Sequence, residues 1–171
     1  MTTFFLRRHP TEHTKAHLDG CSLVLPCAIG RSGVVAAKRE GDGGTPRATL
    51  KILNIYIRRD QWPSRAFPLP VKMIQKDYGW CDDIESPRYN RLVQLPFTAS
   101  HETMWREDPL YDIVLETDWN ASPAIRGRGS AIFIHLARPG LKPTEGCLAL
   151  GRKDMMLFLS RLTRQSRIVI G

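Results

Sequence analysis

The sequence has little cysteine, and none of it is arranged to hold a structural metal. The four cysteines, Cys21, Cys27, Cys81 and Cys147, are too few for a disulfide scaffold in a chain of 171 residues. No two of them form the Cys-x-x-Cys pair that is typical of zinc and redox sites. The first two lie among apolar residues and are predicted to behave as small hydrophobic side chains, while a bridge that involves Cys81 stays open. We expect no cofactor.

Long apolar runs are also missing. The longest one near the start, 23–29, is interrupted by Pro26, and a membrane-spanning helix needs about 20 apolar residues. The first ten residues lack the basic start, the apolar stretch and the small-residue cleavage site of a secretory signal. We therefore expect no membrane span and no signal peptide in this chain.

Three histidines, His9, His13 and His17, are spaced as metal ligands would be on one face of a helix. Pro10 disfavours a helix there. We interpret the histidines as a solvated edge and expect no metal.

Acidic residues are outnumbered. There are 25 Lys and Arg against 17 Asp and Glu, which gives a net charge of +8 and favours an anionic partner such as a carboxylate-rich polymer, a nucleic acid or an acidic membrane. The basic residues are scattered singly or in pairs, without the dense cluster interleaved with aromatics that is usual on a nucleic-acid surface. We expect no nucleic-acid partner, although a basic binding module without catalysis remains an alternative.

The pattern of apolar residues predicts one mainly β domain over residues 1–171. Short apolar stretches, separated by glycine- and proline-rich turns, predict strands at 3–6, 22–28, 34–37, 50–57, 113–116, 131–136 and 167–170. From Asp154, apolar residues recur at helical spacing and predict a helix over 154–164, with Asp154 as its N-cap. A partial capping signal indicates a second short helix at 100–104, and 58–98 is expected to form long loops.

Chemistry is concentrated near the C-terminus, where a predicted strand ends at His135 and a proline-rich loop leads to Gly146 and Cys147. A cysteine attacks as a thiolate, and since a free thiol has a pKa of ~8.5, a histidine must take its proton or hold the thiolate as an ion pair. The backbone N–H groups of Gly146 and Cys147 could stabilise an oxyanion. From the residues alone, however, a packed histidine and an inert thiol are the commoner interpretation.

These residues resemble a known signature. An apolar strand ending in His135, a short loop, Thr144-x-Gly146-Cys147 and the apolar Leu148 are similar to the signature of the L,D-transpeptidase catalytic domain, the YkuD-like family. The family's usual form is His-Gly, then Ser/Thr-His-Gly-Cys, an apolar residue and Arg or Asn. The resemblance implies that Cys147 is the nucleophile and His135 its base.

Other segments extend the resemblance over roughly residues 20–171. The segment 41–46, which ends in Thr45-Pro46, resembles the Gly-x-x-x-Thr-Pro turn of the family, and the stretches 78–83 and 105–112 resemble a single-domain bacterial branch. The fold implied is a β-sandwich of two mixed sheets, with the C-terminal helix at about 154–164 alongside.

The chain departs from the family pattern at three positions beside the reactive pair. Leu136 stands in place of glycine, Glu145 in place of the second histidine and Ala149 in place of Arg. A carboxylate at Glu145 would disfavour the thiolate if it pointed inward. The substrate-binding residues implied by the resemblance and by the need for a cation are Thr144, Glu145, Arg138, Arg126 and Tyr111.

The resemblance implies a bacterial enzyme of peptidoglycan synthesis. Cys147 would be acylated by a stem peptide at an L-centre carbonyl, and an amine of another stem would take the acyl group, forming a 3-3 or a 1-3 cross-link. Water as acceptor would make the protein an L,D-carboxypeptidase, and a disabled site would leave a peptidoglycan-binding module. The family substrate implies a periplasmic or cell-wall-facing location and acylation by carbapenems. The oligomeric state stays open.

Overall fold

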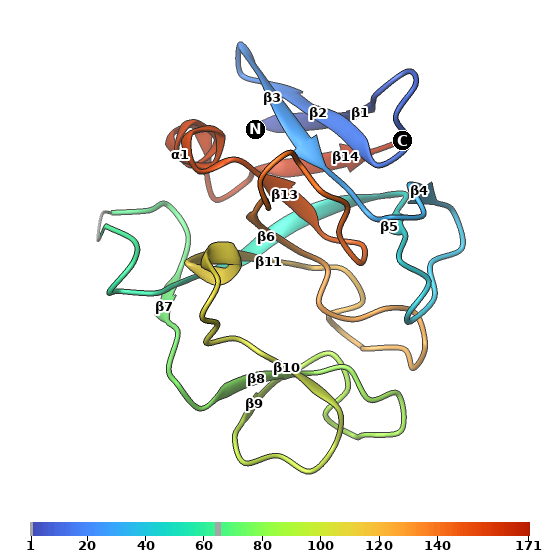
Figure 1. Cartoon of the computed structure of the whole chain (residues 1–171), viewed down its shortest axis with the longest axis vertical. Helices are drawn as coiled ribbons and strands as arrows, with labels where there is room; N and C mark the ends of the chain where they lie inside the picture. The colour runs from blue at the N-terminus through green and yellow to red at the C-terminus, as the bar shows by residue number, and fades with distance from the viewer. Residues whose placement is uncertain (1, 64–65) are drawn as a thin grey trace.

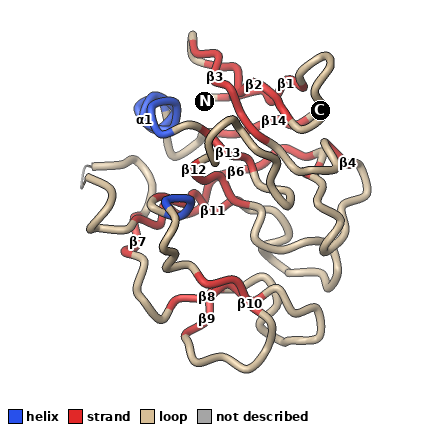
Figure 2. Tube along the Cα trace, in the orientation of Figure 1, coloured by secondary structure: helices blue, strands red, loops and turns tan. Residues whose placement is uncertain are grey.

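The computed structural model describes residues 2–63 and 66–171, in which strands predominate (Figures 1 and 2). The strands form where buried and exposed side chains alternate. In β1, for example, Phe4 and Leu6 are buried while Phe5 between them is exposed. The strand β2 (Lys15–Gly20) repeats the pattern with Ala16 and Leu18 buried, although its apolar residues were too few to predict it.

The elements have the following bounds: β1 (Thr3–Arg8), β2 (Lys15–Gly20), β3 (Leu23–Ala28), β4 (Val34–Val35), β5 (Thr45–Pro46), β6 (Ala48–Ile57), β7 (Val71–Met73), β8 (Tyr78–Cys81), β9 (Leu92–Gln94), β10 (His101–Thr103), the 3-10 helix η1 (Pro109–Tyr111), β11 (Ile113–Thr117), β12 (Phe133–Leu136), β13 (Leu148–Leu150), α1 (Arg152–Arg161) and β14 (Arg167–Ile170).

The main sheet closes on itself. Its strand order is β11-β12-β13-β3-β2-β1-β14-β6-β7, and β6 also pairs with β11. Closure is possible because β6 is ten residues long: its first part pairs with β14 and its second part with β11. The mainly β class is thus confirmed, but in place of the predicted sandwich of two mixed sheets the principal sheet is barrel-like.

A smaller sheet, of order β10-β8-β9, lies apart from the barrel at the bottom of Figure 2. The prediction of a helix at 100–104 was wrong, because His101–Thr103 pair antiparallel with Gly79–Cys81 as strand β10. Strands β7, β8 and β9 also fall inside 58–98, which was predicted to be loops. Within that range, residues 64–65 lie outside the described residues.

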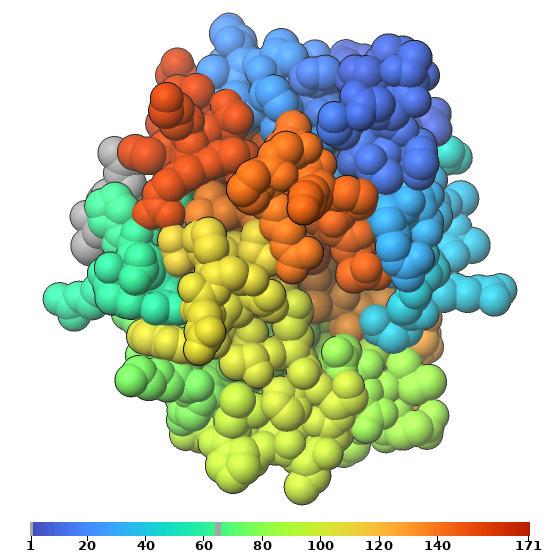
Figure 3. All heavy atoms as spheres, viewed as in Figure 1, coloured from blue at the N-terminus to red at the C-terminus, as the bar shows by residue number. Residues whose placement is uncertain are grey.

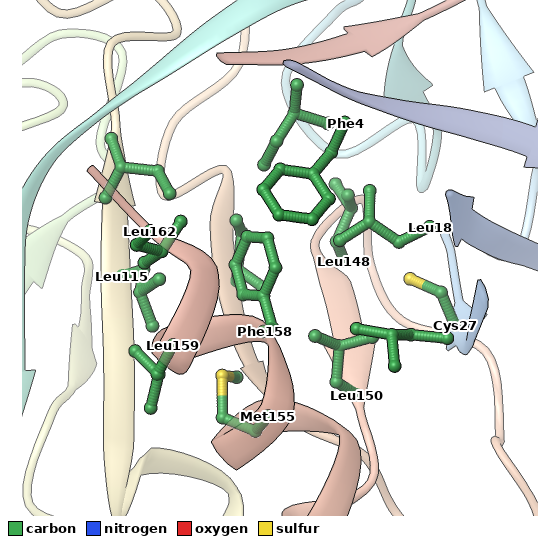
Figure 4. Packing of buried hydrophobic residues seen from close by; sticks show 14 of the residues in the cluster. Phe4, Leu18, Cys27, Leu115, Leu148, Leu150, Met155, Phe158, Leu159 and Leu162 are labelled. Atoms are coloured by element: carbon green, nitrogen blue, oxygen red, sulfur yellow. The ribbon is translucent and has the colours of Figure 1, made fainter. Parts of the chain in front are cut away.

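The helix α1 packs its apolar face against the barrel. Met155, Phe158 and Leu159 are buried, and the Phe158 ring meets Phe4 edge to face at a centroid distance of 4.8 Å (Figure 4). The predicted C-terminal helix is confirmed, but its bounds of 154–164 were shifted. Gly151 is the N-cap, Asp154 lies in the first turn and Leu162 is already extended.

Several further features can be assigned within residues 2–63 and 66–171. No helix there is long and apolar enough to cross a membrane. All four cysteines are free thiols, so the open possibility of a bridge from Cys81 is not realised. The helix that would have aligned three histidines does not form, because His17 lies within β2 and His9 follows β1.

Replacing Phe158 by alanine should destabilise the fold by about 3–5 kcal/mol, because it opens a cavity between α1 and β1. The free energy of unfolding from urea titration measures this. Leu157→Ala is the matched control on the same helix, and since Leu157 is 47% exposed it should change stability by less than about 0.5 kcal/mol. Equal effects of the two substitutions would contradict the packing described.

Candidate active site

The register of two parallel strands brings Cys147 and His135 to one face of the barrel. Strand β12 pairs with β13 so that His135 lies opposite Ala149. Side chains alternate along a strand, so Cys147, two residues before Ala149, lies on the face that His135 shares. Both residues line a pocket of about 500 Å³. The structure therefore brings together the two residues that the sequence singled out.

The Cys147 thiol is held by backbone groups. Sγ donates to the Ala131 carbonyl at 3.0 Å and accepts from the Phe133 N–H at 3.3 Å. Burial, followed by the negative charge of Glu102, raises the pKa of the Cys147 thiol to about 12, against the lowering effect of the Phe133 N–H. The thiol is therefore protonated at neutral pH when no substrate is present.

His135 lines the same pocket and is buried, and its hydrogen bond assigns the proton to one of its ring nitrogens. Nδ1 lies 2.8 Å from the Leu136 carbonyl, so we assign the proton to Nδ1, which leaves the lone pair on Nε2. Burial lowers the pKa of His135 to about 4, although the Leu136 hydrogen bond acts in the opposite direction. The ring packs edge to face with Tyr111 at a centroid distance of 5.3 Å. The resting pair is thus a neutral thiol and a neutral imidazole.

The turn before Cys147 is closed by Thr144. Its Oγ1 donates to the Cys147 carbonyl at 2.6 Å and accepts from the Gly146 N–H at 3.2 Å. Of the two N–H groups expected at an oxyanion site, that of Gly146 is therefore engaged in the resting state. Among the described residues, the Cys147 N–H has no hydrogen-bond acceptor, so it is free to donate.

A second segment, 44–45, fixes the same turn from the other side. Thr45 Oγ1 donates to the Gly146 carbonyl at 2.9 Å and accepts from the Gly30 N–H at 2.9 Å. Gly146 has φ +133°, and a Cβ there would lie 2.7 Å from the Gly44 carbonyl oxygen. Only glycine fits such an approach. The role of Thr45 was not assigned from the sequence, although its Gly-Gly-Thr-Pro context marked the segment.

Asn90 orders the backbone that receives the thiol. Its Oδ1 accepts from the Ala131 N–H at 3.0 Å and from Trp80 Nε1 at 2.9 Å. Ala131 itself has φ +50°, a conformation that is costly for alanine and needs such support. Sequence reasoning missed this role, because nothing local links position 90 to position 131.

The pocket is lined by side chains of both charges. Its cationic residues are Arg106, Arg138 and Lys142, and its acidic residues are Glu40, Asp82, Glu102 and Glu145. Figure 3 shows that the 137–147 loop (orange), the residues near 101–111 (yellow) and the loop near residue 40 (light blue) meet on one face, and all three contribute to the pocket.

The substrate-binding residues predicted from the sequence separate into two groups. Thr144, Glu145, Arg138 and Tyr111 line the pocket. Arg126 is not among the lining residues; its side chain is 60% exposed and its guanidinium lies 3.5 Å from Glu85.

Glu145 does not point at the thiol. Its side chain is 78% exposed and pairs with Arg31 at 2.9 Å. The carboxylate whose charge raises the pKa of the thiol is instead Glu102. It lies on β10 of the small sheet, and nothing in the sequence indicated its place in the site. The negative charge that was expected from Glu145 therefore comes from Glu102.

Comparison with known proteins agrees with this geometry. The family model described as YkuD, L,D-transpeptidase catalytic domain, matches residues 10–170. No curated protein and no solved structure gives a significant match. The family match covers nearly the whole chain and includes both β12 and the turn at Cys147. The chain therefore belongs to the L,D-transpeptidase catalytic domain family.

Proposed function

We propose that this chain is a peptidoglycan L,D-transpeptidase domain in which Cys147 is the nucleophile and His135 the general base. The observation that carries the proposal is the register of β12 and β13, which sets both side chains on one face above a single pocket. Family membership supports the substrate class, and a substrate in the cell wall implies a periplasmic or cell-wall-facing site of action.

The first step is acylation of the thiol. As Sγ attacks the carbonyl of the L-centre in the donor stem, Nε2 of His135 takes the thiol proton, because both groups are neutral at rest. The free N–H of Cys147 stabilises the oxyanion. When the C–N bond breaks, His135 returns the proton to the departing amine of the D-residue, and a thioester remains on Cys147.

The second step transfers the acyl group to an amine of another stem. The amine attacks the thioester carbonyl, the C–S bond breaks and the thiol is restored. Water in place of the amine would give the carboxypeptidase outcome. The cations Arg138 and Lys142 at the pocket support recognition of carboxylates on the stem, since guanidinium and ammonium groups pair with them. In this proposal they supply the positive charge that an arginine at position 149 would supply in the family's usual pattern.

Substituting Cys147 by alanine should reduce turnover of a disaccharide-tetrapeptide by about 1000-fold or more, because the substitution removes the nucleophile. Intact-protein mass should show an acyl adduct on the wild type and none on the variant, and product analysis would separate dimers from trimmed monomers. Cys21→Ala, which removes an exposed thiol, is the control and should remain active. Turnover by Cys147→Ala would overturn the mechanism.

The acid limit of acylation should lie well below pH 6.5. His135 must be neutral to accept the proton, and burial lowers its pKa to about 4, so the rate should hold as pH falls to about 5 and decline only as the imidazole protonates. The pH profile of acylation under single-turnover conditions measures this. His135→Gln should be slow at every pH, whereas His17→Gln, on β2, should match the wild type. A limb near pH 6.5 would remove His135 from this role.

A further inference from the structure

The small sheet turns a pair of carboxylates toward the nucleophile. In the β8–β10 register Glu102 lies opposite Trp80, and Asp82, two residues after Trp80, shares its face. The Trp80 ring meets Phe133 edge to face at a centroid distance of 4.9 Å, and the Phe133 N–H donates to Cys147 Sγ. Asp82 and Glu102 therefore belong to the pocket wall that faces the thiol, and both line the pocket.

This wall holds hydrogen-bond acceptors that nothing in the described part of the chain satisfies. Ser130 lines the pocket and is 8% exposed, yet its buried Oγ has no hydrogen-bond partner. The buried Oδ1 of Asp82 likewise has none. The Tyr89 hydroxyl, which lies near Ser130, donates its own proton to Glu40. Buried acceptors are normally satisfied, so these atoms indicate an N–H donor supplied from outside.

The charges around these acceptor atoms indicate that the group bound here is a cation that donates hydrogen bonds. Burial raises the pKa of the Glu102 carboxyl, and the charges of Asp82 and Asp108 raise it further. Burial, followed by the charge of Glu102, raises the pKa of the Cys147 thiol. Both Asp82 and Glu102 line the pocket with Cys147, so the negative groups lie close to the thiol. The nearest cation, Arg106, is 4.0 Å from Glu102, but it binds both oxygens of Asp108 at 2.8 Å. Arg106 is thus shared between Glu102 and Asp108, so this wall carries more carboxylates than cations on a chain whose net charge is +8.

This charge works against the first half of the reaction, because a carboxylate near a thiol disfavours the thiolate. Glu102 and Asp82 are therefore poorly suited to assist acylation. Once the thioester has formed, that penalty no longer applies, and a carboxylate wall beside the acyl group favours the approach of a cationic amine.

We propose that Asp82, Glu102 and Ser130 form the acceptor subsite and bind the ammonium group of the incoming stem. The inference rests on the proposed transpeptidase function and specifies its acceptor as a primary amine that is protonated in solution. The Asp82 and Glu102 carboxylates and the Ser130 hydroxyl accept its N–H groups, and charge-assisted hydrogen bonds of this kind are the strong ones.

The protons balance in the transfer step. Bound as an ammonium, the acceptor gives one proton to the Glu102 carboxylate and becomes a free amine. Its nitrogen forms the new C–N bond as the C–S bond breaks, and its second proton passes through His135 to the departing sulfur. The products are an amide, a neutral thiol and a protonated Glu102, which returns its proton to solvent.

The test forms the acyl-enzyme with a tetrapeptide stem and adds increasing Nα-acetyl-lysine amide, following the partition between aminolysis and hydrolysis by mass spectrometry. Glu102→Gln and Asp82→Asn should each raise the amine concentration that gives half-maximal aminolysis by about tenfold. Each should also accelerate acylation by the stem, because it removes a charge that disfavours the thiolate. Ser130→Ala should act in the same direction with a smaller effect.

Two controls isolate the charge. Glu85→Gln removes a carboxylate that does not line the pocket and should leave the partition unchanged. Methoxyamine, an acceptor that is uncharged at neutral pH, should partition equally with the wild type and with all the variants. The acylation rate of each variant verifies that it is folded.

The possible outcomes are distinct. Normal acylation with an unchanged half-maximal amine concentration in both carboxylate variants would overturn the acceptor subsite alone. An equal loss with methoxyamine would also overturn it, because the effect would not depend on the ammonium charge. Absence of acylation in the wild type would instead overturn the proposed function, and the subsite with it.

Discussion

The site depends on the close approach of the Gly146–Cys147 turn to the segment at 44–45. The Thr45 hydroxyl links the Gly30 N–H to the Gly146 carbonyl, while the Gly44 carbonyl oxygen occupies the space that a Cβ at position 146 would need. This contact joins segments that are about a hundred residues apart in the sequence. It fixes the peptide that carries the proposed nucleophile, so the direction of the Cys147 N–H and of its thiol follows from it.

Burial around that turn sets the chemistry of the reactive pair. A thiol and an imidazole removed from water are both held in their neutral forms, since desolvation penalises charge. Such a pair is inert until a substrate carbonyl accepts the electron pair of sulfur, which confines ionisation to the transition state.

Sequence patterns predict the parts of this protein that depend on local order or on a motif. The mainly β class, the C-terminal helix and the family resemblance are confirmed, because alternation, helical spacing and the Thr-x-Gly-Cys signature are local. Closure of the barrel was not predictable, because it requires the first part of β6 to pair with β14 and the second part to pair with β11. Strand β10 was mistaken for a helix because three residues carry little propensity, and pairing with β8 decides their state. The sequence did not indicate Glu102 as a site residue, because its place in the pocket depends on the same pairing of β10 with β8.

Two of the three departures from the family pattern, Leu136 and Ala149, occupy positions where the fold accommodates them. Leu136 is 3% exposed in the barrel core, and its carbonyl orients His135, a role for which the backbone alone is needed. Ala149 lies opposite His135, where a long cation would favour the thiolate but would also attract the carboxylates across the pocket. With alanine there, the cations of the pocket are Arg106, and Arg138 and Lys142 on the loop before Cys147. In the proposed reaction the carboxylates of the donor stem therefore pair with cations on the loop between β12 and β13, and not with a cation on β13 itself.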